Sequence, residues 1–403
     1  SMGYLMSVRS SDIGVRLRLA RERLGLSRRR VSTLAGLAPE TVYSIENTNR
    51  MPGIDTVEKL ASVLGVSPAW LAYGGEKVQR VHDFKPAPGF DGLARAASLD
   101  AILRGAGGHI DQSFLYLDPL GAQRYMEIAQ GYRGLPLKEA AASILTLTKE
   151  PITLVALGAG HARHESALAE DLIRADLVDD DGCPSVELVL VDSSAPMLST
   201  GFRHASAQLG PHDIPISTIE GDFTSLPTFS DGFTGRAPRR KLFTLLGYTL
   251  GNMENELSFL RQALMPAVKG DLLLLDFLVS DTNSTDPKKI IVKDPVQKIL
   301  SAGATARTNK MLGFLAGPVT RHFGENVGVS LRAVSNAGAI PKSYAVEFWV
   351  TVDGDKHFMT ASWRRYNPQA LAQSFSRVGW KLVESWQFGP ERPSLLALFQ
   401  RVE

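Results

Sequence analysis

Apolar residues from residue 152 onward are grouped in short runs, and polar or glycine residues follow each run. Between them lie stretches with the spacing of amphipathic helices, such as His164 to Val178. Strands that alternate with helices predict an α/β doubly wound, Rossmann-like sheet with its ligand at the carboxyl ends of the strands. The five runs are Ile152 to Leu157, Val186 to Val191, Ile214 to Ile219, Arg240 to Leu246 and Asp271 to Phe277.

The first run leads into Gly158 and Gly160, and a helix is expected from Ala162 onward. Two glycines permit backbone geometry that a side chain would forbid, and they let a ligand lie against the main chain near a helix N-terminus. The same pattern also fits a dinucleotide site or a well-packed turn.

The residues after the next runs are suited to adenosine. Asp192 follows the second run, where a carboxylate can accept both ribose hydroxyls. Asp222 and Phe223 follow the third, where a carboxylate can bind the adenine amino group and an aromatic ring can cover the base. The fourth run is followed by the phrase G-Y-T-L-G-N, which ends at Asn252.

In this order, G-A-G, Asp192, G-D-F and L-L-G-Y-T-L-G-N resemble a class I S-adenosylmethionine (SAM)-dependent methyltransferase. More narrowly, they are similar to the histidine-specific methyltransferase family of ergothioneine biosynthesis. The similarity runs from about Phe114 to Glu403 and includes Y-L-D-P-L-G from Tyr116 and a late Arg365-Tyr366. It implies SAM as the cofactor, bound by Gly158, Gly160, Asp192, Asp222 and Phe223.

The resemblance also implies roles at the methyl acceptor. Asn252 would contact an amino-acid portion of the substrate, and Tyr248 and Asn252 are the catalytic candidates, although Asn252 could be a turn residue only. Tyr116, Tyr132, Asn252 and Trp363 are the substrate candidates. The family's T-E-x-S-x-K-Y segment holds imidazole through its acidic residue and serine, but Ala361 and Trp363 stand at those positions. We therefore expect a small-molecule acceptor other than histidine.

The N-terminal region has a different pattern. Five short helices are expected over residues 12 to 24, 27 to 35, 38 to 47, 54 to 64 and 67 to 72, with Ser27 capping the second and Gly36 ending it. The segment L-G-L-S-x-x-x-V-S-x-L-A-G-L-A-P-E-T-V-Y-S-I-E-N resembles the phage repressor and Cro class, called XRE-type helix-turn-helix regulators.

That resemblance places the third helix in the DNA major groove. Glu40, Thr41, Tyr43 and Ser44 are the candidates for base contact, and Arg28, Arg29, Arg30 and Arg50 for the phosphates. The family usually has glutamine where Arg28 stands. Residues 1 to 80 carry twelve Lys and Arg against seven Asp and Glu, so +5, which leaves −3 for the remainder of the +2 chain. A protein-contact domain with a solvated arginine helix is the alternative.

These patterns predict a helix-turn-helix domain over residues 8–74, a linker and helix over 75–113, and a methyltransferase-like domain over 114–403. Within the last, residues 281–366 resemble a separate α+β substrate lobe, with a helix expected from Pro295 to Ala316 and strands after it. Gly74 to Asp91 is rich in glycine, proline and charge and is expected to be a linker.

Composition bears on whether the protein spans a membrane, forms disulfides or binds a metal. No apolar run approaches the roughly 20 residues that span a bilayer, and the single cysteine excludes an internal disulfide, so we expect a cytoplasmic protein without membrane contact. No metal is assigned: His161 and His164 are three apart on a helix without a nearby carboxylate partner, and are expected at the surface.

Two functions remain open at this stage. In one, the chain is a methyltransferase for a small molecule and its first domain brings it to DNA. In the other, it is a transcriptional regulator whose methyltransferase-like domain senses SAM or a metabolite. Regulators of this class read two half-sites, so a homodimer on an inverted repeat operator is expected.

Overall fold

The computed structural model describes residues 13–23, 26–48, 50, 52–64, 66, 68–73, 85–117, 119–129, 134–173, 185–230, 239–280, 291–292, 294–389 and 393–403. Tyr132 and Cys183 lie outside these ranges. The chain divides into two compact units, residues 1–81 and 82–403. Within the described part, no helix has the length and apolar character needed to cross a membrane.

The first unit contains five helices among its described residues, α1 (Ile13–Arg23), α2 (Arg28–Leu34), α3 (Thr41–Thr48), α4 (Ile54–Leu64) and α5 (Pro68–Tyr73). The Ser27 side chain accepts a hydrogen bond from the Arg30 backbone and caps α2. Gly36 has φ +62° beyond its end, as expected. The expected third helix starts three residues late, because Ala38 accepts from Thr41 and closes a turn instead.

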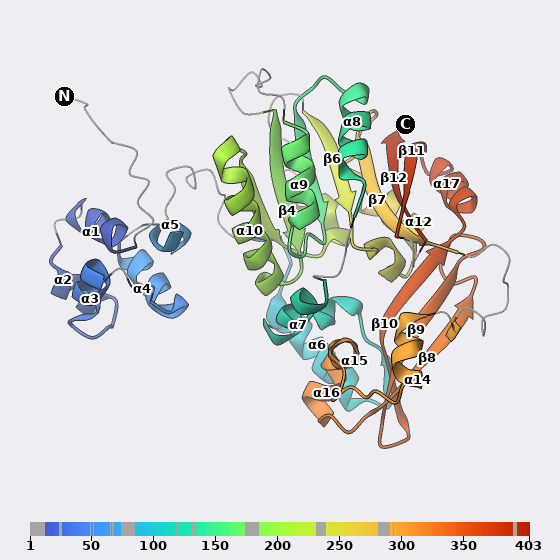
Figure 1. The fold of residues 1–403 in the computed structure, drawn as a ribbon, viewed down its shortest axis with the longest axis horizontal. Helices are drawn as coiled ribbons and strands as arrows, with labels where there is room; N and C mark the ends of the chain where they lie inside the picture. The colour runs from blue at the N-terminus through green and yellow to red at the C-terminus, as the bar shows by residue number, and fades with distance from the viewer. Residues whose placement is uncertain are drawn as a thin grey trace. The chain divides into compact units, whose positions relative to one another are not determined.

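The second unit is built on a sheet in the order β1-β5-β4-β3-β6-β7, in which β1 is Lys85–Pro86 (Figure 1). Strand β12 pairs with β7, and β11 pairs with β12. The parallel strands are β3 (Ile152–Leu157), β4 (Val186–Asp192), β5 (Ile216–Glu220), β6 (Arg240–Leu245) and β7 (Leu272–Val279). Antiparallel β12 (Ser394–Arg401) and β11 (Trp380–Phe388) complete this edge. The expected doubly wound fold is confirmed.

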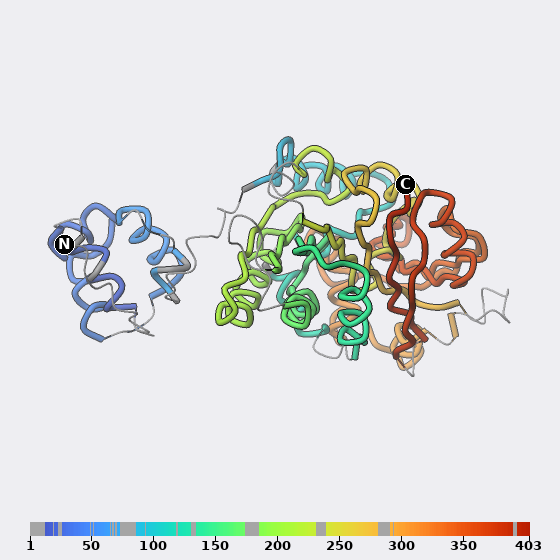
Figure 2. Tube along the Cα trace, turned by 90° about the horizontal axis from the view of Figure 1, so that it is seen from above, coloured from blue at the N-terminus to red at the C-terminus, as the bar shows by residue number. Residues whose placement is uncertain are grey.

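Alternate residues of the central strand belong to two different cores. Ile152, Leu154 and Ala156 pack in the core under α8 (Leu137–Leu147), α9 (Arg163–Asp171) and α10 (Ala195–Leu209). Val155 and Leu157 pack in the core under α12 (Glu256–Gln262) and α17 (Pro368–Ser376). Figure 1 and Figure 2 show helices on both faces of the sheet. Burial on both faces explains the continuous apolar runs of the sequence.

The lobe expected around residues 281–366 shares its core with segments that precede strand β3. It contains α14 (Pro295–Ser301), α15 (Lys310–Leu315) and α16 (Gly317–Phe323), followed by the strands β8 (Gly328–Ser335), β9 (Tyr344–Val352) and β10 (Lys356–Tyr366). The earlier elements α6 (Gly92–Arg104), η2 (Gln112–Leu115) and α7 (Pro119–Ala129) share its core, and β2 (Gly107–His109) pairs with β10.

Strand β7 joins the lobe to the nucleotide fold. Its residues Leu272 to Leu275 pair with β6, and Leu278 and Val279 pair with the end of β10. Strand β12 occupies the opposite edge, since it pairs with Leu272 through Leu278. Strands β6 and β10 therefore pair with successive parts of the same edge of β7.

Two expectations about elements were wrong. The helix expected from Pro295 to Ala316 is two helices, because Gly303 adopts φ +78° and Asn309 caps a new helix through the Met311 and Leu312 amides. The end of the expected linker is also part of the sheet: β1 (Lys85–Pro86) pairs with Ile219 and Glu220 of β5.

Candidate functional site

The loop after β3 has an unusual backbone. Gly158 has φ +70° and Gly160 has φ +52°, and Ala162 adopts φ +53° directly before α9. A Cβ on Gly158 would lie 3.3 Å from Cε1 of Phe223. A Cβ on Gly201 of α10 would lie 2.7 Å from the Gly160 carbonyl oxygen. The glycines thus let a neighbouring ring and a neighbouring helix lie against the loop.

Asp192 at the end of β4 holds this loop. Its Oδ2 accepts the Gly160 amide at 2.9 Å, and its Oδ1 accepts the Ser194 amide at 2.9 Å. Burial raises the pKa of Asp192, although these backbone donors and the charge of Arg95 oppose the increase. A half-buried carboxylate that faces the glycine loop is suited to ribose hydroxyls, because each hydroxyl can donate to it.

Asp222 and Phe223 lie beside the loop, at the end of β5. Asp222 caps η4 (Phe223–Thr228) by accepting the Thr224 amide at 2.9 Å and its hydroxyl at 2.7 Å. The other carboxylate oxygen lies 3.9 Å from Nη1 of Arg95. The Phe223 ring meets Phe259 edge to face at 5.9 Å between centroids. All five cofactor candidates therefore come from adjacent strand ends.

Arg95 of α6 is a residue that sequence reasoning missed. Its guanidinium lies over the rings of Phe90 and Phe114, at 5.6 Å and 5.4 Å from their centroids, and it also bonds the Ser113 hydroxyl. It approaches the site from a helix far from any recognised motif, so no sequence signal pointed to it.

Aromatic side chains form a wall next to the loop. Tyr116 meets Tyr125 at 5.0 Å and Phe314 at 5.5 Å, and Tyr125 stacks with His161 at 6.3 Å. Burial raises the pKa of Tyr125 to about 12 and raises that of Tyr116 further. Both phenols are therefore neutral at pH 7. Of the two, the sequence analysis identified only Tyr116.

The expectation that His161 and His164 lie at the surface was wrong. His161 is buried, and His164 is half-buried with its ring 5.6 Å from that of His161. Burial, together with nearby positive charge from Arg163, lowers the pKa of both imidazoles to about 4. They are neutral at pH 7 and add no positive charge to this wall.

Two further carboxylates lie at this edge. Glu165 of α9 is 4% exposed, and burial raises its pKa to about 8, with the charges of Asp276 and Asp192 adding to the increase. Asp276 of β7 is fully buried and accepts the Tyr248 amide at 2.9 Å. Neither was singled out in the sequence, because burial and charge neighbours depend on the tertiary fold.

The loop after β6 carries both catalytic candidates. Tyr248 adopts φ +61°, its hydroxyl lies 3.0 Å from that of Ser394, and its ring stacks on Phe388. Asn252 ends η5 (Thr249–Asn252) and is half-buried. A Cβ on the preceding Gly251 would lie 3.0 Å from the Arg364 amide of β10. Asn252 therefore lies where the loop meets the lobe.

Trp363 packs against the lobe core, and its indole nitrogen is already bonded. Nε1 donates to Oδ2 of Asp294 at 3.0 Å, and the same oxygen accepts Nη2 of Arg365 at 2.9 Å. Ala361 is 2% exposed and has no polar side-chain atom. Tyr132, the remaining substrate candidate, is outside the described residues.

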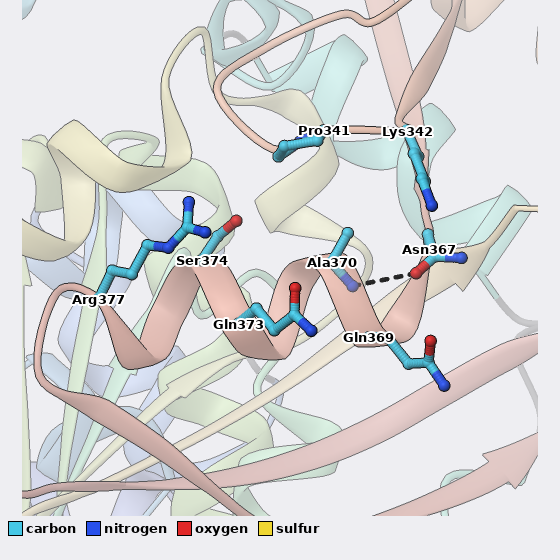
Figure 3. Close-up of a pocket in the computed structure, with 8 residues that line it drawn as sticks. All are labelled: Pro341, Lys342, Asn367, Gln369, Ala370, Gln373, Ser374 and Arg377. Carbon is cyan, nitrogen blue, oxygen red and sulfur yellow. Dashed lines mark hydrogen bonds between the residues drawn. The ribbon is translucent and has the colours of Figure 1, made fainter.

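A shallow groove lies elsewhere on the second unit, along α17 (Figure 3). Lys342 and Arg377 lie along it, and Oδ1 of Asn367 accepts the Ala370 amide at 3.0 Å as the helix cap. None of the cofactor or substrate candidates lines this groove, so we assign it no part in the site.

In the first unit, the residues predicted to bind DNA differ in their surroundings. Tyr43 is 51% exposed, Glu40, Ser44, Arg29, Arg30 and Arg50 are exposed, and Thr41 is half-buried. Arg28, by contrast, donates to Oε2 of Glu46 at 2.6 Å and lies 5.5 Å over the Tyr43 ring. Arg28 thus connects α2 to the predicted recognition helix α3.

Comparison with known proteins gives one family for each unit. Residues 17–71 match the helix-turn-helix family model. Residues 136–288 match the family described as "Histidine-specific methyltransferase, SAM-dependent". A search of curated proteins finds no match.

Solved structures align with both units at low identity. The CcbJ methyltransferase from Streptomyces caelestis is 17% identical, and the alignment covers 69% of this chain and 96% of that one, with a TM-score of 0.35. The magnesium protoporphyrin IX methyltransferase ChlM from Synechocystis PCC 6803 is 12% identical over 71% and 96%, with a TM-score of 0.38.

For the first unit, the P22 c2 repressor is 21% identical over 16% of this chain and all of that one, with a TM-score of 0.16. The two family matches agree with both resemblances seen in the sequence, and the matched methyltransferase family uses SAM. The chain thus joins a region that matches the helix-turn-helix family to a region that matches the SAM-dependent histidine-specific methyltransferase family.

Proposed function

We propose that the second unit transfers a methyl group from SAM to a small molecule other than histidine, an amino-acid-like compound or a secondary metabolite, and that the first unit brings the chain to DNA. The observation that carries this proposal is that the expected cofactor loop lies beside the aromatic wall expected to meet the acceptor. The glycine loop held by Asp192 adjoins the wall of Tyr116 and Tyr125, and Asn252 lies at the lobe.

The residues of the cofactor side fit SAM. Asp192 would accept the ribose hydroxyls, Asp222 the adenine amino group, and Phe223 would cover the base beside Gly158. A side chain at Gly158 would meet Phe223, so the glycine lets this ring lie directly against the loop. When bound, SAM supplies a methyl carbon that is already electrophilic.

The protein's contribution to such a transfer is mainly orientation. Asn252 would fix the acceptor next to the loop, and Tyr248 would fix the loop itself through Asp276 and Ser394. Tyr116 and Tyr125 are half-buried neutral phenols, so they would limit water at this wall while offering hydroxyl groups that donate or accept.

The lobe argues against histidine as the acceptor. An imidazole needs a hydrogen-bond acceptor and a donor, but Ala361 has neither and the Trp363 indole already donates to Asp294. The Trp363 ring would give the acceptor pocket an aromatic surface. We therefore expect an acceptor larger or more apolar than histidine.

Calorimetric titration with S-adenosylhomocysteine tests the cofactor half of this proposal. We expect micromolar binding and a rise in melting temperature that follows ligand concentration. Radiolabelled SAM incubated with histidine and with pooled small-molecule extracts tests the acceptor half. Absence of binding would overturn the function, and conversion of histidine to a methylated product would overturn the assignment of the acceptor.

A second candidate function is a regulator that senses SAM or a metabolite. The exposed Tyr43, Arg29 and Arg30 favour DNA contact, and Ala361 and Trp363 depart from the family's acceptor site. A dimer would bind an inverted repeat. Footprinting of the chain's own promoter with and without SAM separates the two functions, since a sensor requires that the ligand change operator affinity.

A further inference from the structure

The carboxylate of Glu165 is buried without a complete set of partners. The residue lies in the first turn of α9, directly after the glycine loop, and is 4% exposed. Its Oε2 atom has no hydrogen-bond partner among the described residues. Buried polar atoms in native proteins nearly always have a hydrogen-bond partner, so this atom calls for one, and a ligand group that enters the site can supply it.

The charges that face Glu165 from the neighbouring elements are mostly negative. Asp192 of β4 and Asp276 of β7 both disfavour its ionised form, and Tyr125 of α7 faces it as a neutral phenol. On its own side of the loop, His161 and His164 are neutral at pH 7, and Arg163 is the nearby cation. The site therefore favours a ligand that brings positive charge.

The order of the strands indicates which part of the cofactor lies there. Asp222 follows β5, Asp192 follows β4, and the glycine loop and Glu165 follow β3. A ligand with adenine at Asp222 and ribose at Asp192 would place its next portion at the glycine loop. In SAM that portion is the methionyl chain, which carries an ammonium group.

We propose that Glu165 binds the ammonium group of the cofactor's methionyl chain, and that binding expels a proton from the site. The inference rests on the proposed function, because it takes the cofactor site as given. Glu165 is a binding residue in this scheme, and the methyl acceptor does not contact it.

The proton follows from the state of Glu165 before binding. With a pKa of about 8, its carboxyl is mostly protonated and neutral at pH 7. An ammonium group at hydrogen-bond distance favours the ionised form and lowers the pKa. The proton leaves to solvent, and the carboxylate accepts a hydrogen bond from the ammonium, so charge is balanced within the pair.

Comparing the affinities for two nucleosides distinguishes this role of Glu165 from a general disruption of the cofactor site. S-adenosylhomocysteine carries the ammonium group, whereas 5′-methylthioadenosine has the same adenosine and a thioether but no amino-acid portion. We expect Glu165→Gln to weaken the binding of S-adenosylhomocysteine on the order of tenfold to a hundredfold, the scale of a lost charge-assisted hydrogen bond. The affinity for 5′-methylthioadenosine should stay unchanged. Glu170→Gln is the matched control, because Glu170 lies on the same helix but is exposed.

Calorimetry of the wild-type protein gives an independent measurement. Titration with S-adenosylhomocysteine at pH 7, in buffers of different ionisation enthalpy, should show release of most of one proton, and 5′-methylthioadenosine should release none. This measurement decides the question even if Glu165→Gln does not fold.

The outcomes distinguish this inference from the proposed function. If neither nucleoside binds the wild-type protein, the cofactor site itself is wrong. If both bind, but Glu165→Gln weakens them equally or the wild-type protein releases no proton, the role of Glu165 is overturned while the methyltransferase proposal stands.

Discussion

Replacing Glu46 with glutamine should destabilise the helix-turn-helix unit far more than its small size change suggests. The Glu46 side chain is fully buried, and Arg21 binds it with two nitrogens, Nε at 2.7 Å and Nη2 at 3.1 Å. Arg28 adds a third contact at 2.6 Å. Glutamine keeps the volume but removes the negative charge, and its amide group would face guanidinium donors.

The cost follows from the burial of Arg21. Its side chain is 10% exposed, and its other carboxylate contact among the described residues is the exposed Glu22, 3.4 Å from Nη2. Loss of the Glu46 charge therefore leaves a poorly compensated cation in the core, which costs about 3 to 5 kcal/mol. The Arg28 contact contributes less, because that side chain is 38% exposed and water screens it. A domain of this size has a total stability of only a few kcal/mol, at about 0.05 to 0.15 kcal/mol per residue.

Thermal unfolding followed by circular dichroism and limited proteolysis would measure the effect. We expect the transition of the first unit to fall by at least ~10 °C, while the second unit and its cofactor-induced shift stay unchanged. Glu58→Gln, on the exposed face of α4, is the control. A shift no larger than that of the control would refute the reasoning.

The pH dependence of the same unit has a defined sign. Burial alone would raise the pKa of Glu46, but hydrogen bonds from Arg21 and Arg28 outweigh it and hold that pKa below its usual value. The stabilisation is therefore fully present above the unfolded pKa of about 4.3 and is lost as the pH falls through the folded value. The wild-type unit should lose stability in acid, and Glu46→Gln should flatten that slope.

Five further substitutions test the two sites. Asp192→Ala should weaken S-adenosylhomocysteine in calorimetry by about 1 to 3 kcal/mol, and unchanged affinity would exclude Asp192 from the ribose site. Gly158→Ala should lower cofactor affinity and melting temperature together, because φ +70° strains an L residue; an unchanged melting temperature would contradict this. In DNA titrations over a range of salt, Arg29→Ala or Arg30→Ala should each reduce the salt slope by about 1 without loss of stability. Arg28→Ala should also lower the melting temperature, since Arg28 is bound to Glu46, and equal behaviour of the three arginines would contradict that distinction.

The sequence predicted the sheet well where strands are buried on both faces. The run Ile152 to Leu157 is the whole of β3, because every one of its residues is buried. Prediction failed where backbone geometry interrupts a favourable pattern: the periodicity of Pro295 to Ala316 continues across Gly303, but the chain turns there. Strand β1 was missed because its pairing with β5 joins residues distant in the sequence.

Only those site residues that belong to sequence motifs could be predicted from the sequence. Asp192, Asp222 and the two glycines stand at strand ends, so their common location follows from the parallel topology. Glu165 and Tyr125 carry no such motif, because their role comes from burial and from charge neighbours on other elements, such as Asp276 of β7. His161 and His164 were placed at the surface for the same reason. The pattern of the helix that follows them does not reveal that Tyr125 of α7 stacks on His161.

On one side, β7 pairs first with β6 of the nucleotide fold and then with β10 of the lobe. Leu275 is the last residue of β7 that pairs with β6, Leu278 is the first that pairs with β10, and the Tyr248 amide bonds to Asp276 between them. The spacing between the glycine loop and the proposed acceptor surface of the lobe is therefore set by main-chain pairing rather than by side chains. If the lobe binds the methyl acceptor, as proposed, substitutions on its inner surface can change which molecule is accepted without altering this spacing, so acceptor choice can diverge by point mutation while the donor side stays constant.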